Sequence, residues 1–239
     1  MVRRLHLRRD VALLVAEAHA GRDGEYAMGG KTKMKKYELT AETKEIGGKI
    51  LHRIRALIDI PLHDVKAGDL GGWIEADRNL SQEGSAWVAD EAWVTGSAWV
   101  TGSAWVTGSA RVTDSAWVMG KALVTGSACV TGSACVTGKA LVTGEARVTG
   151  NAWVRGNARV MESSDCITIG AIGSRDDTTT FYRGTDGGIY VSCGFFSGSI
   201  DDFSAEVKQV HAGTKHERTY LLAIELAKAQ IATEEESDG

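Results

Sequence analysis

The sequence predicts a mainly β protein, in which a solenoid of very short repeated strands precedes a small C-terminal α+β domain. Thirteen consecutive six-residue units run from Ser85 to Glu162. Their second position is Ala and their fourth is Val throughout. The 239 residues also include 29 Gly but one Pro, Pro61. Because Gly-rich loops normally contain Pro as well, this imbalance indicates that Gly recurs at a fixed place in a repeated structure.

Residues 1–33 form the first segment, and we expect an N-terminal extension that is helical or disordered. Four Arg, the apolar run VALLVA and an Ala-His-Ala triplet resemble a secretory signal, but an apolar run of six residues is shorter than such signals contain. One alternative is a short amphipathic helix that begins at Asp10 and ends before Gly21. Another is an upstream extension before a translation start at Met34.

The composition also bounds the cellular setting and the partners. No apolar run approaches the length of a membrane span, so no membrane contact is expected. A net charge of −4 disfavours nucleic acid as a partner. Neither a metal site nor another cofactor is expected, because the four Cys have no C-x-x-C spacing, and free thiols suit a reducing cytoplasm. These are Cys129, Cys135, Cys166 and Cys193.

Residues 34–84 are predicted to form a β-rich N-terminal cap and the first coil of the solenoid. Leu70, Trp73, Ile74 and Leu80 are larger than the Ala and Val of the repeat. The end of a solenoid otherwise exposes strand edges and an apolar interior, so we expect these four side chains to plug it. On this interpretation Trp73 closes the end and is not a platform for a ligand.

Residues 85–162 form the repeat, and one unit already predicts its own shape. In an extended Ala-Trp-Val segment, Ala92 and Val94 point to one face and Trp93 to the other. The next residues, Thr95 and Gly96, are followed by Ser97, and Gly permits the dihedral angles of a corner. The repeated unit therefore predicts a prism with Ala and Val inside and the third position outside.

Two features of the chain resemble known families. Starting from the valine, the unit reads VTGSAW and resembles the hexapeptide repeat of left-handed β-helices, with right-handed β-helices as the second choice. That resemblance implies eighteen-residue triangular coils, of which thirteen units give a little over four. The segment GDLGGWIE at 68–75, followed by NLS at 79–81, is similar to the start of YdcK-like β-helix proteins of bacteria and phages. This second resemblance implies a fold and a phage or mobile-element origin, and it transfers no catalytic residue.

Eighteen-residue coils sort the outward third position into three columns, of which two are largely apolar. Large apolar surfaces on a protein usually mark an interface. We therefore predict that these two columns form an interaction surface, covered by other copies of the chain, with a trimer favoured, or by a protein partner. Tryptophans that merely stack on one another along each face are the alternative. The predicted surface consists of Trp87, Trp105, Leu123 and Leu141 on one face and Trp99, Trp117 and Trp153 on another.

The function predicted from these features is a non-catalytic scaffold that acts by binding or assembly. The hexapeptide-repeat resemblance implies an alternative, acyl transfer from CoA or a carrier protein with a histidine base. The six His include none between residues 64 and 210, which disfavours that chemistry. A carbohydrate-binding module that uses the outward Trp columns is a further alternative.

Residues 163–232 are predicted to form the small α+β domain, and residues 233–239 an acidic tail. The pattern predicts strands over 166–173, 178–183 and 188–196 and helices over 200–211 and 215–232. The densest polar group is a candidate polar site, with an ordinary hairpin turn as the alternative. Its members are Arg175, Asp176, Asp177 and Arg183. A nucleophile at Cys193 with His211 or His216 as base lacks an orienting motif, so a structural thiol is favoured.

Overall fold

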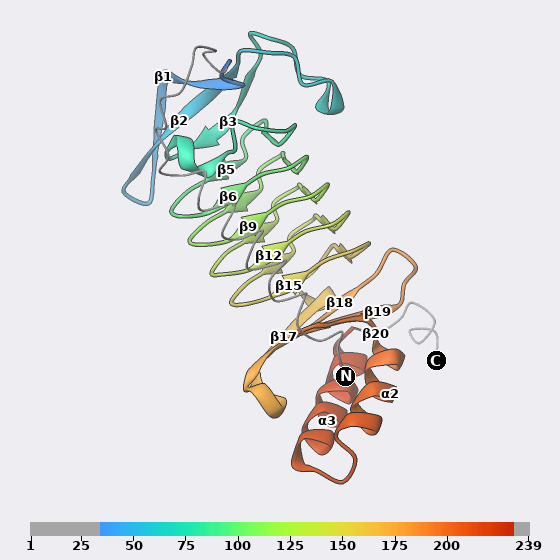
Figure 1. Ribbon diagram of the computed structural model, residues 1–239. Helices are drawn as coiled ribbons and strands as arrows, with labels where there is room; N and C mark the ends of the chain where they lie inside the picture. The colour runs from blue at the N-terminus through green and yellow to red at the C-terminus, as the bar shows by residue number, and fades with distance from the viewer. Residues whose placement is uncertain (1–33, 232–239) are drawn as a thin grey trace, which may run out of the picture. The chain divides into compact units, whose positions relative to one another are not determined.

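The computed structural model describes residues 34–231, so the expected extension over 1–33 and the acidic tail over 233–239 lie outside the described residues. The described part is mainly β (Figure 1). A stack of short coils leads into an antiparallel sheet and then into two helices. The predicted fold class, a solenoid with a small C-terminal α+β part, is confirmed.

Each of the thirteen repeat units contributes one two-residue strand, formed by its third and fourth positions. Each of the first ten strands pairs in parallel with the strand eighteen residues further along, as Leu123 with Leu141 and Val124 with Val142. The strands are β4 (Trp87–Val88), β5 (Trp93–Val94), β6 (Trp99–Val100), β7 (Trp105–Val106), β8 (Arg111–Val112), β9 (Trp117–Val118), β10 (Leu123–Val124), β11 (Cys129–Val130), β12 (Cys135–Val136), β13 (Leu141–Val142), β14 (Arg147–Val148), β15 (Trp153–Val154) and β16 (Arg159–Val160).

The strands stack into three faces, which we number in chain order. Face 1 contains β3 (Leu70–Ile74), β5, β8, β11 and β14. Face 2 contains the bridge from Leu80 to Val100 and then β9, β12 and β15. Face 3 contains β4, β7, β10, β13 and β16. The solenoid therefore makes about five turns, since the segment before the repeat adds a coil to those of the thirteen units.

The inside of the solenoid is filled by the second and fourth positions of each unit. All of these Ala and Val residues, from Ala86 to Val160, are at most 1% exposed. Ladder hydrogen bonds such as Leu123 N to Ala140 O and Thr125 N to Val142 O, both 2.9 Å, join successive coils. The interior is thus apolar and narrow, which explains why larger side chains do not occur at these positions.

The corners explain where the glycines of the repeat are needed. Ten of the thirteen units end in Gly, and each of these has a positive φ angle. A Cβ atom on Gly138, whose φ is +76°, would lie 2.7 Å from the backbone N of Gly156 in the next coil. Such a position combines a left-handed conformation with a close approach of two backbones, so Gly is favoured there.

An antiparallel hairpin caps the N-terminal end. It consists of β1 (Tyr37–Ile46) and β2 (Lys49–Ala56), and β2 pairs with β3, so the hairpin extends face 1 into a seven-stranded sheet. The short helices η1 (Pro61–His63) and η2 (Asp77–Asn79) flank β3. The hairpin supplies Tyr37 and Ile54, both fully buried, to the core cluster at this end.

The prediction that four large side chains fill the N-terminal end of the solenoid is confirmed for two of them and wrong for the other two. Ile74 and Leu80 are buried in the core, as expected. Leu70 is 48% exposed, because it lies at the start of β3 beside the hairpin. Trp73 aligns with Trp93 in the outward column and is covered from outside by the hairpin, so it does not fill the prism.

A four-stranded antiparallel sheet follows the last coil, after the short helix η3 (Ser163–Asp165). Its strands are β17 (Cys166–Ile172), β18 (Asp177–Arg183), β19 (Ile189–Cys193) and β20 (Phe196–Ser199), with η4 (Gly173–Arg175) between the first two. The segment predicted as one strand over 188–196 forms β19 and the start of β20, because Gly194 turns the chain with a φ of +55°.

The C-terminal sheet separates two hydrophobic cores. Tyr182 on one face joins the core of the solenoid, while Phe181 and Val191 on the other face pack against the helices. These are α2 (Ile200–Val210) and α3 (Lys215–Gln230), whose N-termini are capped by the side chains of Ser199 and Thr214. The sheet therefore closes the C-terminal end of the solenoid, as the hairpin closes the other end.

Replacing Val124 by Asp is predicted to unfold the solenoid, because the carboxylate would be buried among Ala and Val without a partner. Val124 is 0% exposed. Circular dichroism and urea denaturation measure the effect. The matched control is Leu123→Asp, whose side chain points outward from the same strand and should leave the spectrum unchanged. A Val124→Asp protein with the wild-type spectrum and urea midpoint would contradict the inward assignment.

Lys36 predicts a pH dependence of stability. Its side chain is 1% exposed, and its Nζ donates to Ala86 O at 2.7 Å and to Glu83 O at 3.4 Å. Burial lowers its pKa from 10.5 to about 8. Below pH 8 the lysine is charged in the folded and unfolded states, and the folded state bears the cost of the buried charge. Between pH 8 and 10.5 the folded state binds fewer protons than the unfolded state, so the contribution of Lys36 to stability rises with pH.

We therefore expect the wild type to gain stability relative to Lys36→Met as the pH rises from 8 to 10.5. The gain should amount to about 1.4 kcal/mol per pH unit, or roughly 3 kcal/mol over the whole window. Urea denaturation of both proteins at several pH values measures it. The buried thiols of Cys135 and Cys166, whose raised pKa values act in the opposite direction, are present in both proteins and cancel. A constant difference between the two proteins would refute the assignment to Lys36.

Candidate functional site

The outward column of face 3 contains aromatic and aliphatic side chains in register. Trp105 aligns with Leu123, and Leu123 with Leu141, all of them partly buried. Trp87 aligns with Trp105 but is 1% exposed and belongs to the core cluster with Tyr37, so it is not part of the outer surface. The exposed part of the apolar column on face 3 therefore starts at Trp105.

The structure also brings a histidine onto face 3. His63, at the end of η1, lies with its ring centroid 5.0 Å from that of Trp105. Burial is the main cause that holds the pKa of His63 below its ordinary value. His63 precedes the repeat, so the periodicity of the sequence does not predict its place on face 3. A tertiary contact of the η1 segment decides that position.

Face 2 presents the second apolar column. The rings of Trp99 and Trp117 meet edge to face, with centroids 5.8 Å apart. Cys135 follows them, and burial raises the pKa of its thiol to about 11. Trp153 ends the column with 36% of its surface exposed, and the guanidinium of Arg155 lies 4.8 Å from its ring centroid. The predicted residues of this face thus form one continuous outward column.

Face 1 is polar by comparison. The indole of Trp73 donates to Glu91 at 3.1 Å, and the Nζ of Lys44 lies 4.4 Å from its ring centroid. Lys44 also pairs with Glu91 at 3.0 Å. Further along the column, Arg111 and Arg147 are exposed. The three faces therefore differ in chemistry, as the sorting into columns predicts.

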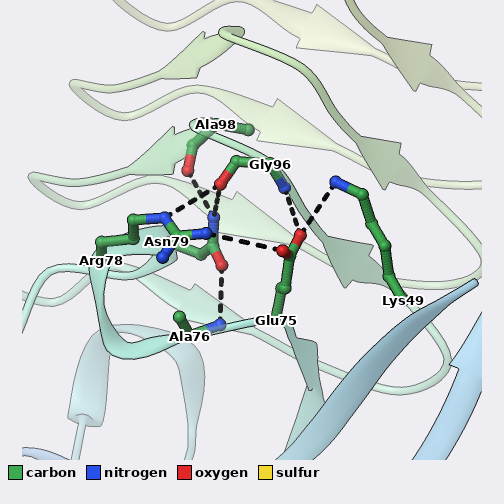
Figure 2. Close-up of polar contacts among 7 residues, drawn as sticks. All are labelled: Lys49, Glu75, Ala76, Arg78, Asn79, Gly96 and Ala98. Atoms are coloured by element: carbon green, nitrogen blue, oxygen red, sulfur yellow. Dashed lines mark hydrogen bonds and ion pairs between the residues drawn. The ribbon is translucent and has the colours of Figure 1, made fainter.

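The polar residues of the GDLGGWIE and NLS motif bind the neighbouring coil (Figure 2). The carboxylate of Glu75 accepts from Gly96 N at 2.6 Å and from Lys49 Nζ at 3.0 Å. The Gly96 hydrogen bond is the main cause of the lowered pKa of Glu75. Asn79 donates to Gly96 O at 3.1 Å and to Ala98 O at 2.9 Å (Figure 2).

The glycines of the same motif are also structural. A Cβ on Gly71 would lie 2.6 Å from Val88 O, and one on Gly72 would lie 2.6 Å from Ala92 O. The motif therefore allows the first coil to approach the second closely and satisfies the backbone groups of its corner. Its residues build the fold.

Two carboxylates replace Gly at corners and bind the next coil. Asp90 accepts from Thr107 Oγ1 at 2.5 Å and from Gly108 N at 3.0 Å. Asp114 accepts from the hydroxyl of Thr131 and from Gly132 N, the latter at 3.1 Å. The threonine hydrogen bonds are the largest cause of the lowered pKa values of both carboxyl groups. A corner N–H of this repeat is thus a good donor to a carboxylate.

The structure separates the four residues of the candidate polar site. Arg175, Asp176 and Asp177 are exposed at the start of β18, where the Arg175 guanidinium lies 4.6 Å from the ring centroid of Phe195. Arg183 lies at the other end of the same strand, roughly 20 Å away for six extended residues. There its Nε donates to Asp165 at 2.6 Å. The expected grouping is wrong because the strand that joins its members is extended.

Cys193 has hydroxyl neighbours. Its Sγ accepts from Thr179 Oγ1 at 3.2 Å and lies 3.7 Å from Tyr220 Oη. His211 packs against the ring of Tyr220, with centroids 5.6 Å apart, and against His216. Within the described residues, the thiol of Cys193 therefore makes no direct contact with His211 or His216, the two histidines weighed as its base.

The remaining observations are of residues 34–231. No group of His, Cys, Asp and Glu side chains in this range could hold a metal ion. Neither of the helices described there is long and apolar enough to cross a membrane. In comparisons with known proteins, no protein-family model matches the chain and no curated protein matches its sequence.

Proposed function

We propose that the protein is a non-catalytic, left-handed β-helix scaffold of the hexapeptide-repeat type, related to the YdcK-like proteins, that acts by assembly. One observation carries the proposal: two of its three faces present aligned columns of large apolar side chains at the position that points outward. Trp105, Leu123 and Leu141 form one column, and Cys135 and Trp153 continue the other. The third face carries Arg111 and Arg147 at the same position.

The outward columns expose apolar surface that another molecule can cover. The third position joins the ladder through its backbone, but its side chain points outward and has no role inside the coil. Filling it with Trp and Leu on two faces leaves apolar surface outside, and removing such surface from water gains about 25 cal/mol per Å². Five coils about 4.8 Å apart make each face roughly 20 Å tall, which suits a side-by-side contact of two prisms.

We propose a second copy of the chain as the partner, in a trimer. A closed trimer needs two complementary faces on each subunit, and faces 2 and 3 are the two apolar faces. The resemblance to hexapeptide-repeat proteins supports this arrangement, because prisms of that family often pack side by side in threes. Face 1, with its exposed arginines and its salt-bridged hairpin, would then face solvent.

Carbohydrate binding is the second candidate. The observation that favours it is Trp153, which keeps 36% of its surface exposed at the end of the face 2 column. A flat aromatic ring in this position can pack against the apolar face of a sugar ring. Acyl transfer has less support, since the ring of His63, which lies on face 3, packs against Trp105.

Light scattering of the full chain tests the assembly. We expect a mass of three times the 25.5 kDa of one chain at micromolar concentration. Leu141→Asp on face 3 and Trp153→Gln on face 2 should each lower the mass towards the monomer, because each removes apolar contact from one side of the interface. The matched control is Arg147→Gln on face 1, which should leave the trimer intact.

Circular dichroism of all three variants confirms that the coils remain folded, since each change is at an outward position. A wild-type chain that is monomeric at micromolar concentration would refute the assembly proposal. A trimer that survives both apolar-face variants would refute the choice of faces 2 and 3.

A further inference from the structure

A cavity of about 400 Å³ lies where the last coil meets the C-terminal sheet. Arg155 and Asn157 line it from the coil, and Tyr182, Asp186, Tyr190 and Ser197 line it from the sheet. Its volume is in the range of small-molecule sites. This cavity is distinct from the outward columns, so it raises a separate question of what it binds.

The coil contributes two backbone donors to this region. In the preceding coil, Thr137 N donates to Val154 O at 2.9 Å and Lys139 N donates to Gly156 O at 2.8 Å. The equivalent N–H groups of the last coil belong to Arg155 and Asn157, eighteen residues on. No further coil follows to accept them, and within residues 34–231 neither of these N–H groups makes a hydrogen bond.

The C-terminal sheet satisfies the neighbouring donors of the same edge. Trp153 N donates to Thr180 Oγ1 at 3.0 Å, and Met161 N donates to Asp165 Oδ2 at 2.9 Å. A parallel ladder directs these N–H groups towards the next coil, which here means towards the sheet. The donors of Arg155 and Asn157 therefore point to the side where the cavity lies.

The side chain of Arg155 adds a positive charge at the same place. Its guanidinium packs over the ring of Trp153, which holds it in position. Its Nε is buried and has no hydrogen-bond partner in the described part of the chain. Since a buried donor without a partner is costly, a ligand that accepts hydrogen bonds would be stabilised here.

The opposite wall offers acceptors. The carboxylate of Asp186 is held by Tyr190 Oη at 2.7 Å and by Gly188 N at 3.1 Å. These hydrogen bonds, the one from Tyr190 first, lower the pKa of Asp186, so it is ionised at neutral pH. Ser197, which is exposed, adds a hydroxyl group. No ion pair joins Asp186 to Arg155 across the described cavity, so both charges are available to a ligand between them.

We propose that this cavity binds a small carboxylate that also carries hydroxyl groups, that is, a sugar acid. The carboxylate would accept from the N–H groups of Arg155 and Asn157 and from the guanidinium, and the ligand hydroxyls would donate to Asp186. The solenoid already uses backbone donors in this way, since Gly108 N and Gly132 N donate to Asp90 and Asp114. A carboxylate without hydroxyl groups has no donor for the remaining acceptor positions of Asp186, which already accepts from Tyr190 and Gly188.

Amide chemical shifts of the full chain in solution test the proposal, with D-glucuronate as the probe. We expect the amide signals of Arg155 and Asn157 to shift saturably at millimolar concentration. D-glucose, which lacks the carboxylate, and inorganic phosphate, which lacks the hydroxyl-bearing ring, should each bind at least about tenfold more weakly. Equal binding of glucose would overturn the role of the carboxylate, and tighter binding of phosphate would overturn the sugar-acid class.

Arg155→Gln should weaken glucuronate binding at least about tenfold, because it removes a charge-assisted hydrogen bond. The matched control is Arg159→Gln, an exposed arginine of the same coil that does not line the cavity. A second variant, Ser197→Tyr, fills the cavity from the sheet without changing its charge and should also abolish the shifts. The proposal fails if glucuronate shifts neither amide, or if Arg155→Gln and Arg159→Gln bind it equally well.

Discussion

The parallel hydrogen-bond ladder between coils is the interaction on which the rest of this structure depends. Each coil donates and accepts along three short strands, and the coil eighteen residues further on repeats the same pattern. The ladder needs small residues inside, which are the Ala and Val of every unit, and a left-handed corner at its sixth position. Since the backbone supplies these bonds, the outward side chains can vary without loss of the fold.

The same ladder has backbone N–H and C=O groups without a neighbouring coil at each of its ends, and different segments bind them at the two ends. At the N-terminal end, β2 adds an antiparallel strand to face 1, and Lys36, Glu75 and Asn79 bind backbone groups of the first coils with their side chains. At the C-terminal end, the sheet satisfies Trp153 N and Met161 N with side chains of the segment that follows the coils. It leaves the neighbouring donors of the last coil beside a cavity, which is why a ligand site is proposed there.

The three faces differ in the side chains that point outward from the third position of each unit. The coil fixes the direction of every third-position side chain, so a choice of residue every eighteen positions is enough to make two faces largely apolar and one mixed. Arg111 and Arg147 fall on face 1, whereas Leu123, Leu141 and Trp153 fall on the other two. Assembly uses faces 2 and 3, and the small-molecule site lies at the end of the prism, where Trp153 of face 2 holds Arg155 of the cavity.

The sequence by itself determined the solenoid and the inward positions of each unit, because strict repetition makes each local preference act in register with the next. The resemblance to left-handed β-helices added the eighteen-residue coil, which sorts the outward positions into columns. The sequence also determined the C-terminal strands and helices closely, apart from the turn at Gly194 that divides one predicted strand. Only the tertiary structure decided the burial of Trp87, the outward position of Trp73, the contact of His63 with Trp105 and the separation of Arg183 from Arg175. These depend on how nonrepeating segments pack against the coils, and no period in the sequence encodes such contacts.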